Sequence, residues 1–164
     1  KYMRVTVKEL GDHSKAVKNL KKGTRVFFEG PYGTFVTGKA SKGHIVLVGG
    51  GVGITPLRAL LEEFDHAKSI DVLFRASREE DLVLRDELDE LAKSRGARVH
   101  YLVGSRKVHE MDAKHISKIV PAFADSDVYV CGPTPLVEAV REACKDAGIP
   151  KNRFHDEAFE FHSV

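Results

Sequence analysis

The sequence predicts an α/β fold in which a doubly wound parallel sheet carries helices on both faces. Three observations support this prediction. From residue 43 onward, apolar runs of strand length alternate with segments whose apolar residues recur at helical spacing. The runs are almost continuously apolar, as in strands that are covered on both faces. A glycine-rich turn, Gly49–Gly53, joins the first run to the first helix, which is typical of units that place a phosphate at a helix N-terminus.

Residues 1–42 have a different pattern and are assigned to a separate domain from residues 43–164. Strands are expected at Met3–Val7 and Arg25–Glu29, on either side of a short helix. Two strands and a short helix cannot bury a core of their own. We therefore expect residues 1–42 to be the tail of a β domain whose earlier strands are missing.

The second domain is expected to contain strands and helices in alternation. The strands are predicted at Ile45–Val48, Ile70–Phe74, Arg98–Val103, Val128–Cys131 and Arg153–Phe161. The helices are predicted to begin at Thr55, Asp81, Asp112 and Thr134, because each of these residues can cap a helix N-terminus. Proline follows two of these caps directly, at Pro56 and Pro135, and suits the first helical position.

The composition excludes several functions. The net charge is only +2, and nucleic-acid binding needs a concentrated basic face, so no nucleic-acid partner is expected. No apolar run approaches the roughly 18 residues needed to cross a bilayer. The two cysteines give no disulfide framework, and the eight histidines lack a second ligand at metal-site spacing, so no metal site is expected. One basic group is interpreted either as a solvated face or as a docking surface for a membrane or an acidic partner: Lys15, Lys18, Lys21, Lys22 and Arg25.

The ends of the predicted strands carry the candidate binding residues, because ligands on parallel sheets bind at the carboxyl ends of the strands. The first end is the glycine turn, which departs from the usual dinucleotide pattern because Pro56 stands where a third glycine is normal. The second and third ends carry guanidinium and hydroxyl groups that suit a 2′-phosphate. These residues are Arg75, Ser77, Arg78, Ser105 and Arg106. The sequence therefore favours NADP(H) over NAD(H).

The fourth predicted strand ends in Cys131-Gly132-Pro133. A cysteine at the ligand edge could act as a nucleophile, but no histidine lies nearby in the sequence as a base and no second cysteine offers a redox pair. A buried, structural Cys131 is favoured over a nucleophile. Cys144 belongs to the apolar stripe of the following helix and is assigned to the core.

Together these features resemble the ferredoxin–NADP⁺ reductase superfamily. The matching segments occur in the family's order, at Gly11–Ser14, Gly30–Gly33, Gly50–Pro56, Cys131–Pro133 and His155–Phe159. The family has proline at the position of Pro56, which accounts for the departure noted above. The chain is most similar to the reductase portion of bacterial ferric-reductase-like membrane flavocytochromes, which are related to NADPH oxidases.

The resemblance implies a role for each matched position. His13 and Ser14 belong to the segment that contacts the FAD pyrophosphate, and the flavin side of the barrel is lined by Gly30, Pro31, Tyr32 and Gly33. The nucleotide loop comprises Gly50, Gly51, Val52, Gly53, Ile54, Thr55 and Pro56. The positions nearest the reacting rings, assigned as catalytic, are Thr55, Cys131 and Glu157, with Gly132 and Pro133 beside them. Phe159 or Phe161 covers the flavin, and Ser105 and Arg106 match the family's 2′-phosphate pair.

The implied activity is that of an NAD(P)H-dependent flavin oxidoreductase, which transfers a hydride from NADPH to FAD and passes electrons to haem, ferric iron or oxygen. The expected context is the cytoplasmic side of a membrane, next to a haem-bearing transmembrane domain of the same polypeptide. Two alternatives stay open. One is a soluble reductase for a ferredoxin or an oxygenase, and the other is a module that binds NADP(H) without turnover.

The family's main flavin-binding motif, Arg-x-Tyr/Phe-Ser/Thr, should precede Lys1 and is absent. Residues 1–42 therefore match only the C-terminal part of an antiparallel FAD-binding β-barrel, whereas residues 43–164 match the NAD(P)-binding, Rossmann-like domain. We expect the chain to be a soluble fragment with an incomplete FAD site, weak or no flavin retention and no activity on its own.

Overall fold

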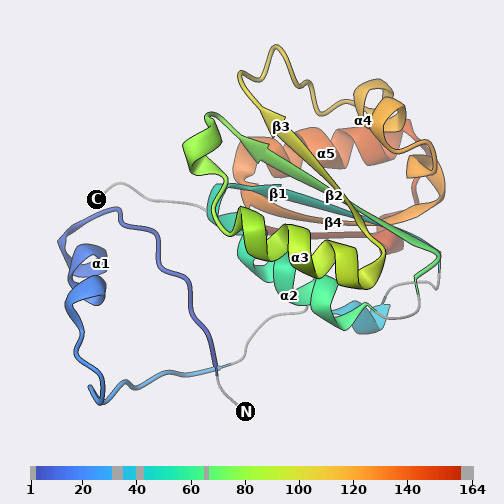
Figure 1. Cartoon of the computed structure of the whole chain (residues 1–164). Helices are drawn as coiled ribbons and strands as arrows, with labels where there is room; N and C mark the ends of the chain where they lie inside the picture. The colour runs from blue at the N-terminus through green and yellow to red at the C-terminus, as the bar shows by residue number, and fades with distance from the viewer. Residues whose placement is uncertain (1–2, 31–34, 40–42, 65–66, 160–164) are drawn as a thin grey trace. The chain divides into compact units, whose positions relative to one another are not determined.

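The computed structural model describes residues 3–30, 35–39, 43–64 and 67–159. Figure 1 draws the remaining residues as a thin grey trace. The chain divides into two units, residues 1–34 and residues 35–164, and each is described by itself. The domain boundary predicted after residue 42 adjoins residues outside the described ranges and stays a prediction.

The second unit is built on one parallel sheet with the strand order β3-β2-β1-β4-β5 (Figure 1). The strands are β1 (His44–Gly50), β2 (Ser69–Ala76), β3 (Arg98–Val103), β4 (Ser126–Pro133) and β5 (Phe154–Phe159). The chain winds outward from the central β1 to β2 and β3, and then crosses back to β4 and β5. All neighbouring strands pair in parallel. The predicted doubly wound α/β fold is therefore confirmed, with each strand predicted for this unit in place.

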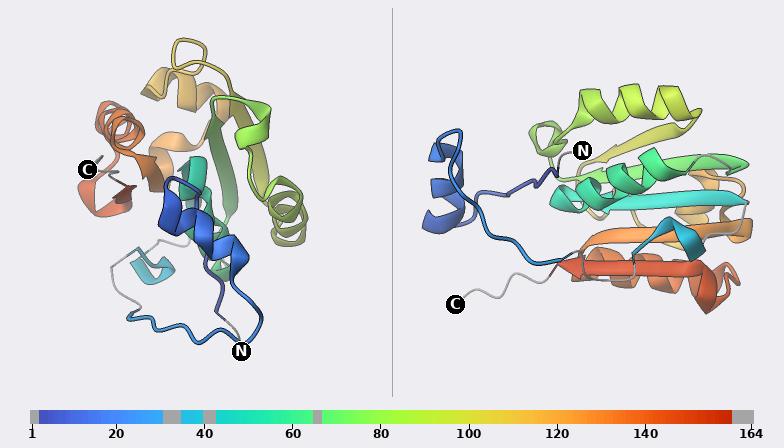
Figure 2. Two further views of the ribbon diagram at one scale, coloured as in Figure 1. Left: turned by 90° about the vertical axis from the view of Figure 1, so that its left-hand side faces the viewer. Right: turned by 90° about the horizontal axis from the view of Figure 1, so that it is seen from below.

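Two pairs of helices cover the two faces of this sheet. They are α2 (Ile54–Glu63) and α3 (Arg85–Arg95) on one face, and α4 (Ala113–Ile119) and α5 (Thr134–Asp146) on the other. The left panel of Figure 2 shows α3 and α5 on opposite sides of the strands. Alternate side chains of each strand enter the two cores. In β1, for example, Ile45 and Leu47 pack toward α2 and α3, whereas Val46 and Val48 pack toward α4 and α5. A central strand buried on both faces explains the continuous apolar run.

Helix α2 begins one residue before the predicted cap. It starts at Ile54, after a 3-10 turn over Gly51–Gly53, and its N-cap is Gly53. The prediction that Thr55 caps this helix is wrong, because its hydroxyl donates a hydrogen bond back to the carbonyl of Val52 at 2.9 Å. Pro56 falls in the first turn, where its missing N–H breaks no helical hydrogen bond.

Of the other three predicted helix caps, one is confirmed and two are wrong. Asp112 caps α4 as predicted, since its carboxylate accepts from the main-chain N–H of His115 at 2.6 Å. Helix α5 begins at Thr134 itself, with Pro133 as the cap, so the cap predicted at Thr134 is one residue late. Asp81 lies in a separate 3-10 turn, and α3 begins only at Arg85. The break lies at Leu84, which has a left-handed backbone with φ of 61°.

The first unit contains one short helix, α1 (Asp12–Ala16), followed by a 3-10 turn over Val17–Asn19. The strands expected at Met3–Val7 and Arg25–Glu29 are not formed, and the part of an antiparallel barrel that they would build is therefore not formed by residues 3–30. A strand needs a neighbour to pair its N–H and C=O groups, and residues 3–30 include no paired segment. None of these residues is buried, and Phe27 is 86% exposed.

Candidate functional site

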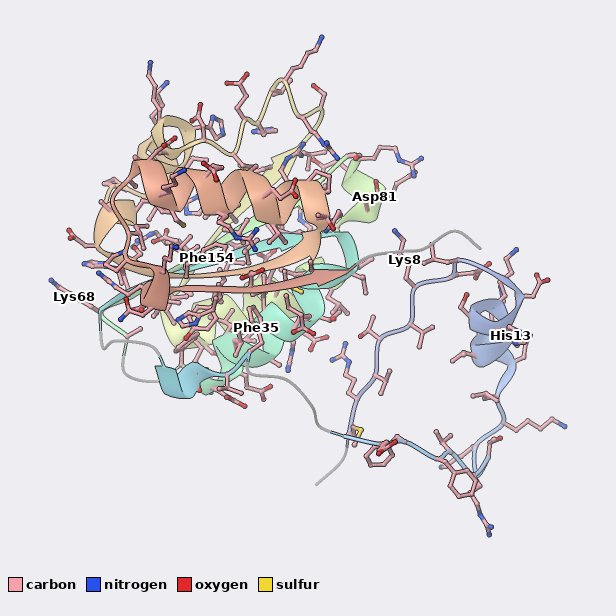
Figure 3. All side chains as sticks on the ribbon, turned by 180° about the vertical axis from the view of Figure 1, so that it is seen from behind. Lys8, His13, Phe35, Lys68, Asp81 and Phe154 are labelled. Carbon is pink, nitrogen blue, oxygen red and sulfur yellow. The ribbon has the colours of Figure 1, made fainter. Side chains whose placement is uncertain are left out.

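The carboxyl edge of the sheet brings several of the predicted site residues into one row. In the strand register, Gly50 pairs with Arg75 on one side of β1, and Gly49 pairs with Cys131 on the other. Cys131 in turn pairs with Glu157 of β5. Figure 3 shows this edge at Asp81, at the opposite end of the sheet from Lys68. Neighbouring strands lie about 4.8 Å apart, so residues that are distant in the sequence share one edge here.

The glycine loop is locked against the end of β4. A Cβ on Gly53 would lie 2.1 Å from the carbonyl oxygen of Cys131, and one on Gly50 would lie 2.6 Å from Cδ2 of Leu136 and 3.2 Å from Cδ of Pro133. Gly132 is less tight but still close, since its Cβ would lie 3.2 Å from the main-chain nitrogen of Gly50. The two loops therefore touch through main chain, and side chains at these glycines would separate them.

Gly51 differs from its neighbours because its added Cβ would meet nothing within 4 Å. Its φ is +56°, a left-handed conformation that glycine adopts without strain. The turn that it starts leads directly into the ten-residue helix α2, whose first N–H groups have no partner within the helix. Open space, bare main chain and a helix N-terminus together fit the phosphates of a nucleotide.

Cys131 is fully buried, and burial together with the negative charge of Glu157 raises the pKa of its thiol to about 12. A thiol that stays protonated at neutral pH is a poor nucleophile. The structure therefore favours the structural interpretation of Cys131 that the sequence favoured. Cys144 lies on the buried face of α5, in the core, as predicted. Glu157 is exposed on the edge strand β5, beside Cys131 in the register.

The ends of β2 and β3 carry the predicted phosphate residues, and these residues differ in how their charges are compensated. Arg78 forms ion pairs with Glu80 at 2.5 Å and Asp81 at 3.4 Å. Arg106 is exposed and forms no ion pair with any described residue. Ser77 and Ser105 are exposed beside them. Among the three arginines, Arg106 is therefore the one whose guanidinium is both accessible and uncompensated.

Arg75 points its guanidinium at main-chain oxygens. Nη1 donates to the carbonyls of Ala76 at 2.8 Å and Leu102 at 2.6 Å, and Nη2 donates to the carbonyl of Gly104 at 3.0 Å. Burial, and then the positive charge of Arg106, lower the pKa of Arg75. The positive charges of Arg75 and Arg106 at the ligand edge therefore favour an anion near Arg106, whereas the donors of Arg75 are directed at carbonyl oxygens.

The predicted flavin residues of the first unit are only partly described. His13 is exposed, and the hydroxyl of Ser14 accepts from the N–H groups of Leu10 and Gly11, both at 2.9 Å. Gly30 has a φ of +140°. Three neighbours of Gly30 lie outside the described residues: Pro31, Tyr32 and Gly33. Phe161 and the side chain of Phe159 lie outside them as well, although the main chain of Phe159 completes β5 next to Pro133.

Two residues at this edge were not found from the sequence. His109, in the loop after β3, uses Nε2 to donate to the carbonyl of Val103 at 3.0 Å. The sequence places His109 four residues after Ser105, which is only weak evidence that the two residues belong to one loop structure. Leu136 forms the floor under Gly50 and Gly132, and its place in an apolar helical stripe predicts only core packing.

The described residues contain neither a metal-binding cluster nor a membrane-spanning helix. No group of three or more His, Cys, Asp or Glu side chains in those ranges has an arrangement that could hold a metal ion. No helix among the same residues is long and apolar enough to cross a membrane.

Comparisons with known proteins agree with this geometry. The family model described as "Oxidoreductase NAD-binding domain" matches residues 47–142. An NADH-cytochrome b5 reductase 1 of Aspergillus terreus is 31% identical over 172 residues, covering 92% of this chain and 58% of the relative. A glycine betaine monooxygenase reductase subunit of Pseudomonas aeruginosa is 28% identical over 153 residues, covering 86% of this chain and 42% of the relative. The chain thus spans about half the length of the curated relatives it matches.

Solved structures share the fold. The cytochrome b5 reductase domain of Ulva prolifera nitrate reductase superposes with a TM-score of 0.68 at 22% identity, covering 90% of this chain and 66% of that chain. At this level of identity the likeness shows the fold alone. The family match spans more than half of the chain and includes both the glycine loop and the Cys131–Pro133 segment. The chain therefore belongs to the oxidoreductase NAD-binding domain family, of the ferredoxin reductase-like superfamily.

Proposed function

We propose that the second unit is the nicotinamide-nucleotide-binding part of a flavin-dependent oxidoreductase, and that it prefers NADP(H) to NAD(H). The observation that carries this proposal is the carboxyl edge of the sheet. There an open Gly51 lies on a loop locked to Cys131–Pro133, and the neighbouring strand ends carry the mutually repelling Arg75 and Arg106.

The chain's own residues would divide the work of binding. The main chain of Gly51–Gly53 and the start of α2 would hold the pyrophosphate, because the turn leaves open space at Gly51 and lies at the positive end of the helix dipole. Ser105 and Arg106 would hold the 2′-phosphate through a hydroxyl and a forked guanidinium. Ser77 and Arg78 would border this site, with Arg78 already paired to Glu80 and Asp81.

The nicotinamide end would lie at Cys131 and Gly132, beside the glycine loop. The buried, protonated thiol of Cys131 would give the ring a neutral wall, and the exposed carboxylate of Glu157 would accept a hydrogen bond from its carboxamide. Thr55 would approach the same ring from α2. When bound, the nucleotide supplies the hydride and FAD accepts it. The protein's contribution is to position the two and to exclude water, with no covalent step on a side chain.

The whole protein's partners belong to the proposal as well. The relatives' names, a cytochrome b5 reductase and a monooxygenase reductase subunit, support onward electron transfer to a haem protein or an oxygenase. The narrower candidate is the reductase portion of a membrane flavocytochrome, on the cytoplasmic side beside a haem-bearing transmembrane domain, and it rests on the sequence motifs. Haem absorbance bands in the membrane-bound whole polypeptide would support it, and their absence would favour the soluble reductase.

The NADH named for the first of these relatives makes NAD(H) the competing nucleotide. Titration calorimetry of the 164-residue chain with NADP⁺ and with NAD⁺ distinguishes the two, using wild type and Arg106→Ala. We expect NADP⁺ to bind at least tenfold more tightly than NAD⁺, and the substitution to remove that difference. Equal binding of both nucleotides by both proteins would refute the 2′-phosphate site. Failure to bind either nucleotide would refute the nucleotide site altogether.

The flavin site of the first unit is proposed to be incomplete in this chain. Residues 3–30 bury no side chain, whereas a flavin ring needs an enclosing apolar surface. The visible spectrum of the purified chain tests this, because a stoichiometric yellow chromophore would show that the site is more complete than proposed.

A further inference from the structure

The loop between β3 and α4, residues 104–112, carries Ser105 and Arg106 but contains no helix or strand. Fixing the backbone of such a loop costs conformational entropy. A phosphate site on the loop is therefore preorganised only if other groups hold the loop in place. Met111 and Asp112 anchor the far end of the loop, at the core and at the cap of α4. Around Ser105 and Arg106 two other side chains hold it, and neither of them needs to touch a ligand.

The first is Arg75, the next-to-last residue of β2, which pairs with Leu102 in the strand register. Its guanidinium joins the carbonyls on both sides of the end of β3, those of Leu102 at 2.6 Å and Gly104 at 3.0 Å. The contact to Gly104 lies one residue before Ser105. Arg75 therefore fixes the direction in which the chain leaves the sheet.

The second is His109, which closes the loop from the other side. Its Nε2 donates to the carbonyl of Val103 at 3.0 Å, so the ring lies against the end of β3. Its main-chain N–H and that of Val108 both donate to the carbonyl of Ser105, at 3.2 Å and 3.1 Å. The ring also packs edge-to-face on His115 of α4, with centroids 5.8 Å apart. Ser105 and Arg106 thus lie inside a turn that is fastened at both ends.

From these contacts we infer that Arg75 and His109 are positioning residues that set the nucleotide preference by holding Ser105 and Arg106 in the phosphate-binding arrangement. Arg75 adds an electrostatic effect to the geometric one. Neither Arg75 nor Arg106 forms an ion pair with a described acidic residue, and each opposes the other's charge. A dianionic phosphate at Arg106 would relieve that repulsion. This inference rests on the proposed function, because it assigns a cause to the preference proposed there.

The test compares binding and loop order in the 164-residue chain. Calorimetry gives the dissociation constants of NADP⁺ and NAD⁺ for wild type, Arg75→Gln and His109→Leu. Amide hydrogen exchange follows the N–H groups of Val108 and His109, with those of β1 as an internal reference. We expect each variant to bind NADP⁺ about tenfold more weakly and NAD⁺ within twofold of wild type, with exchange faster at Val108 and His109 only.

Matched variants distinguish a loss of loop positioning from a loss of positive charge and from a failure to fold. Lys107→Gln removes a positive charge beside Arg106 from an exposed side chain, and we expect a change below threefold and no effect on exchange. His109→Gln keeps an amide donor near the position of Nε2 and should restore NADP⁺ binding, whereas the shorter amide of His109→Asn should not. This pair keeps the test decisive if His109→Leu fails to fold.

The outcomes separate the inference from the proposed function. A wild type that prefers NADP⁺, with Arg75→Gln and His109 variants that keep the same preference, would overturn the inference alone. Equal loss of both nucleotides would also overturn it, because it would indicate a purely structural role. A wild type without any preference would overturn the 2′-phosphate site and the inference together.

Discussion

A Cβ on Gly53 would lie 2.1 Å from the carbonyl oxygen of Cys131, so the turn after β1 and the end of β4 meet through main chain. Neither side of this contact can yield by rotating a side chain. The glycine at residue 53 therefore has a steric role, which differs from the conformational role of Gly51 two residues earlier.

Gly53→Ala should disrupt this contact and lower both stability and nucleotide affinity. Overpacking of this kind costs about 1–3 kcal/mol, or roughly 2–4 °C in melting temperature per kcal/mol for a chain of this size. We also expect NADP⁺ affinity to fall at least tenfold, because the loop must move away from Cys131. Thermal unfolding and calorimetry on the same preparation measure the two effects.

Gly51→Asn is the matched control for Gly53→Ala. Asn tolerates the left-handed conformation, and the added Cβ would meet no described atom within 4 Å, so stability should stay within about 0.5 kcal/mol of wild type. Nucleotide affinity should still fall, because the side chain would occupy the space assigned to the pyrophosphate. Unchanged affinity in Gly51→Asn would place the pyrophosphate elsewhere.

Both thiols should be inert in the folded protein. Burial raises the pKa of Cys144 to about 12, and burial with the charge of Glu157 does the same for Cys131. At pH 8 a thiol with such a pKa is thiolate in only about one molecule in 10⁴. We expect no reaction with a disulfide reagent in native buffer and two equivalents in denaturant. Rapid native labelling that disappears in Cys131→Ser would revive the nucleophile interpretation.

Strand positions were predictable from the sequence where a strand is buried on both faces and therefore largely apolar, as in β1, β2 and β4. The edge strands β3 and β5 are only partly buried and carry more polar side chains. The start of α3 was not predictable in the same way. Leu84 adopts a left-handed conformation that leucine rarely takes, and nothing in its neighbours marks the break. The alternation at residues 3–7 predicted a strand, but alternation supplies no pairing partner.

The candidate site also has features that the sequence predicts and features that it does not. Residue type and strand ends were enough to place Arg75, Ser105 and Arg106 at one edge, since parallel strands share their carboxyl ends. They could not reveal that the donors of Arg75 are taken by carbonyls of β3 and the following loop. That depends on the register between β2 and β3, which the sequence does not specify. The role of His109 depends on loop geometry for the same reason.

Tyr129 should contribute through its ring far more than through its hydroxyl. The ring stacks on His155 at a centroid distance of 4.3 Å and meets Phe35 and Phe64 edge-on, each at 5.6 Å. Among the described residues, the hydroxyl makes only a 3.4 Å contact, with the carbonyl of Val36. Tyr129→Phe should therefore cost less than about 1 kcal/mol of unfolding free energy, and Tyr129→Ala about 3–5 kcal/mol. Urea unfolding monitored by circular dichroism distinguishes the two, and similar losses would assign the stabilisation to the hydroxyl.

Asp71 should make stability depend on acid pH. Its carboxylate is buried near the amino end of β2 and accepts from Nε and Nη2 of Arg98, at 2.8 and 2.5 Å, and from Nε2 of His100 at 2.8 Å. Burial by itself raises the pKa of Asp71, but the hydrogen bonds from His100 and Arg98 and the charges of both outweigh it and lower the pKa below its usual value.

A carboxyl whose pKa is lower in the folded than in the unfolded state stabilises the protein above the unfolded pKa of about 4. This stabilisation is lost as the pH falls below that value toward the folded pKa. Asp71→Asn should cost about 1.5–3 kcal/mol at pH 7, because it removes hydrogen bonds between charged groups. The variant should also lose less stability than wild type does as the pH falls below 4. Asp146→Asn, which neutralises an exposed carboxylate in the last turn of α5, should cost no stability at pH 7, because a negative charge there opposes the helix dipole. It should leave the loss of stability below pH 4 in place. Urea midpoints from pH 7 to pH 2.5 provide the test, and parallel curves for wild type and Asp71→Asn would show that Asp71 does not cause the acid sensitivity.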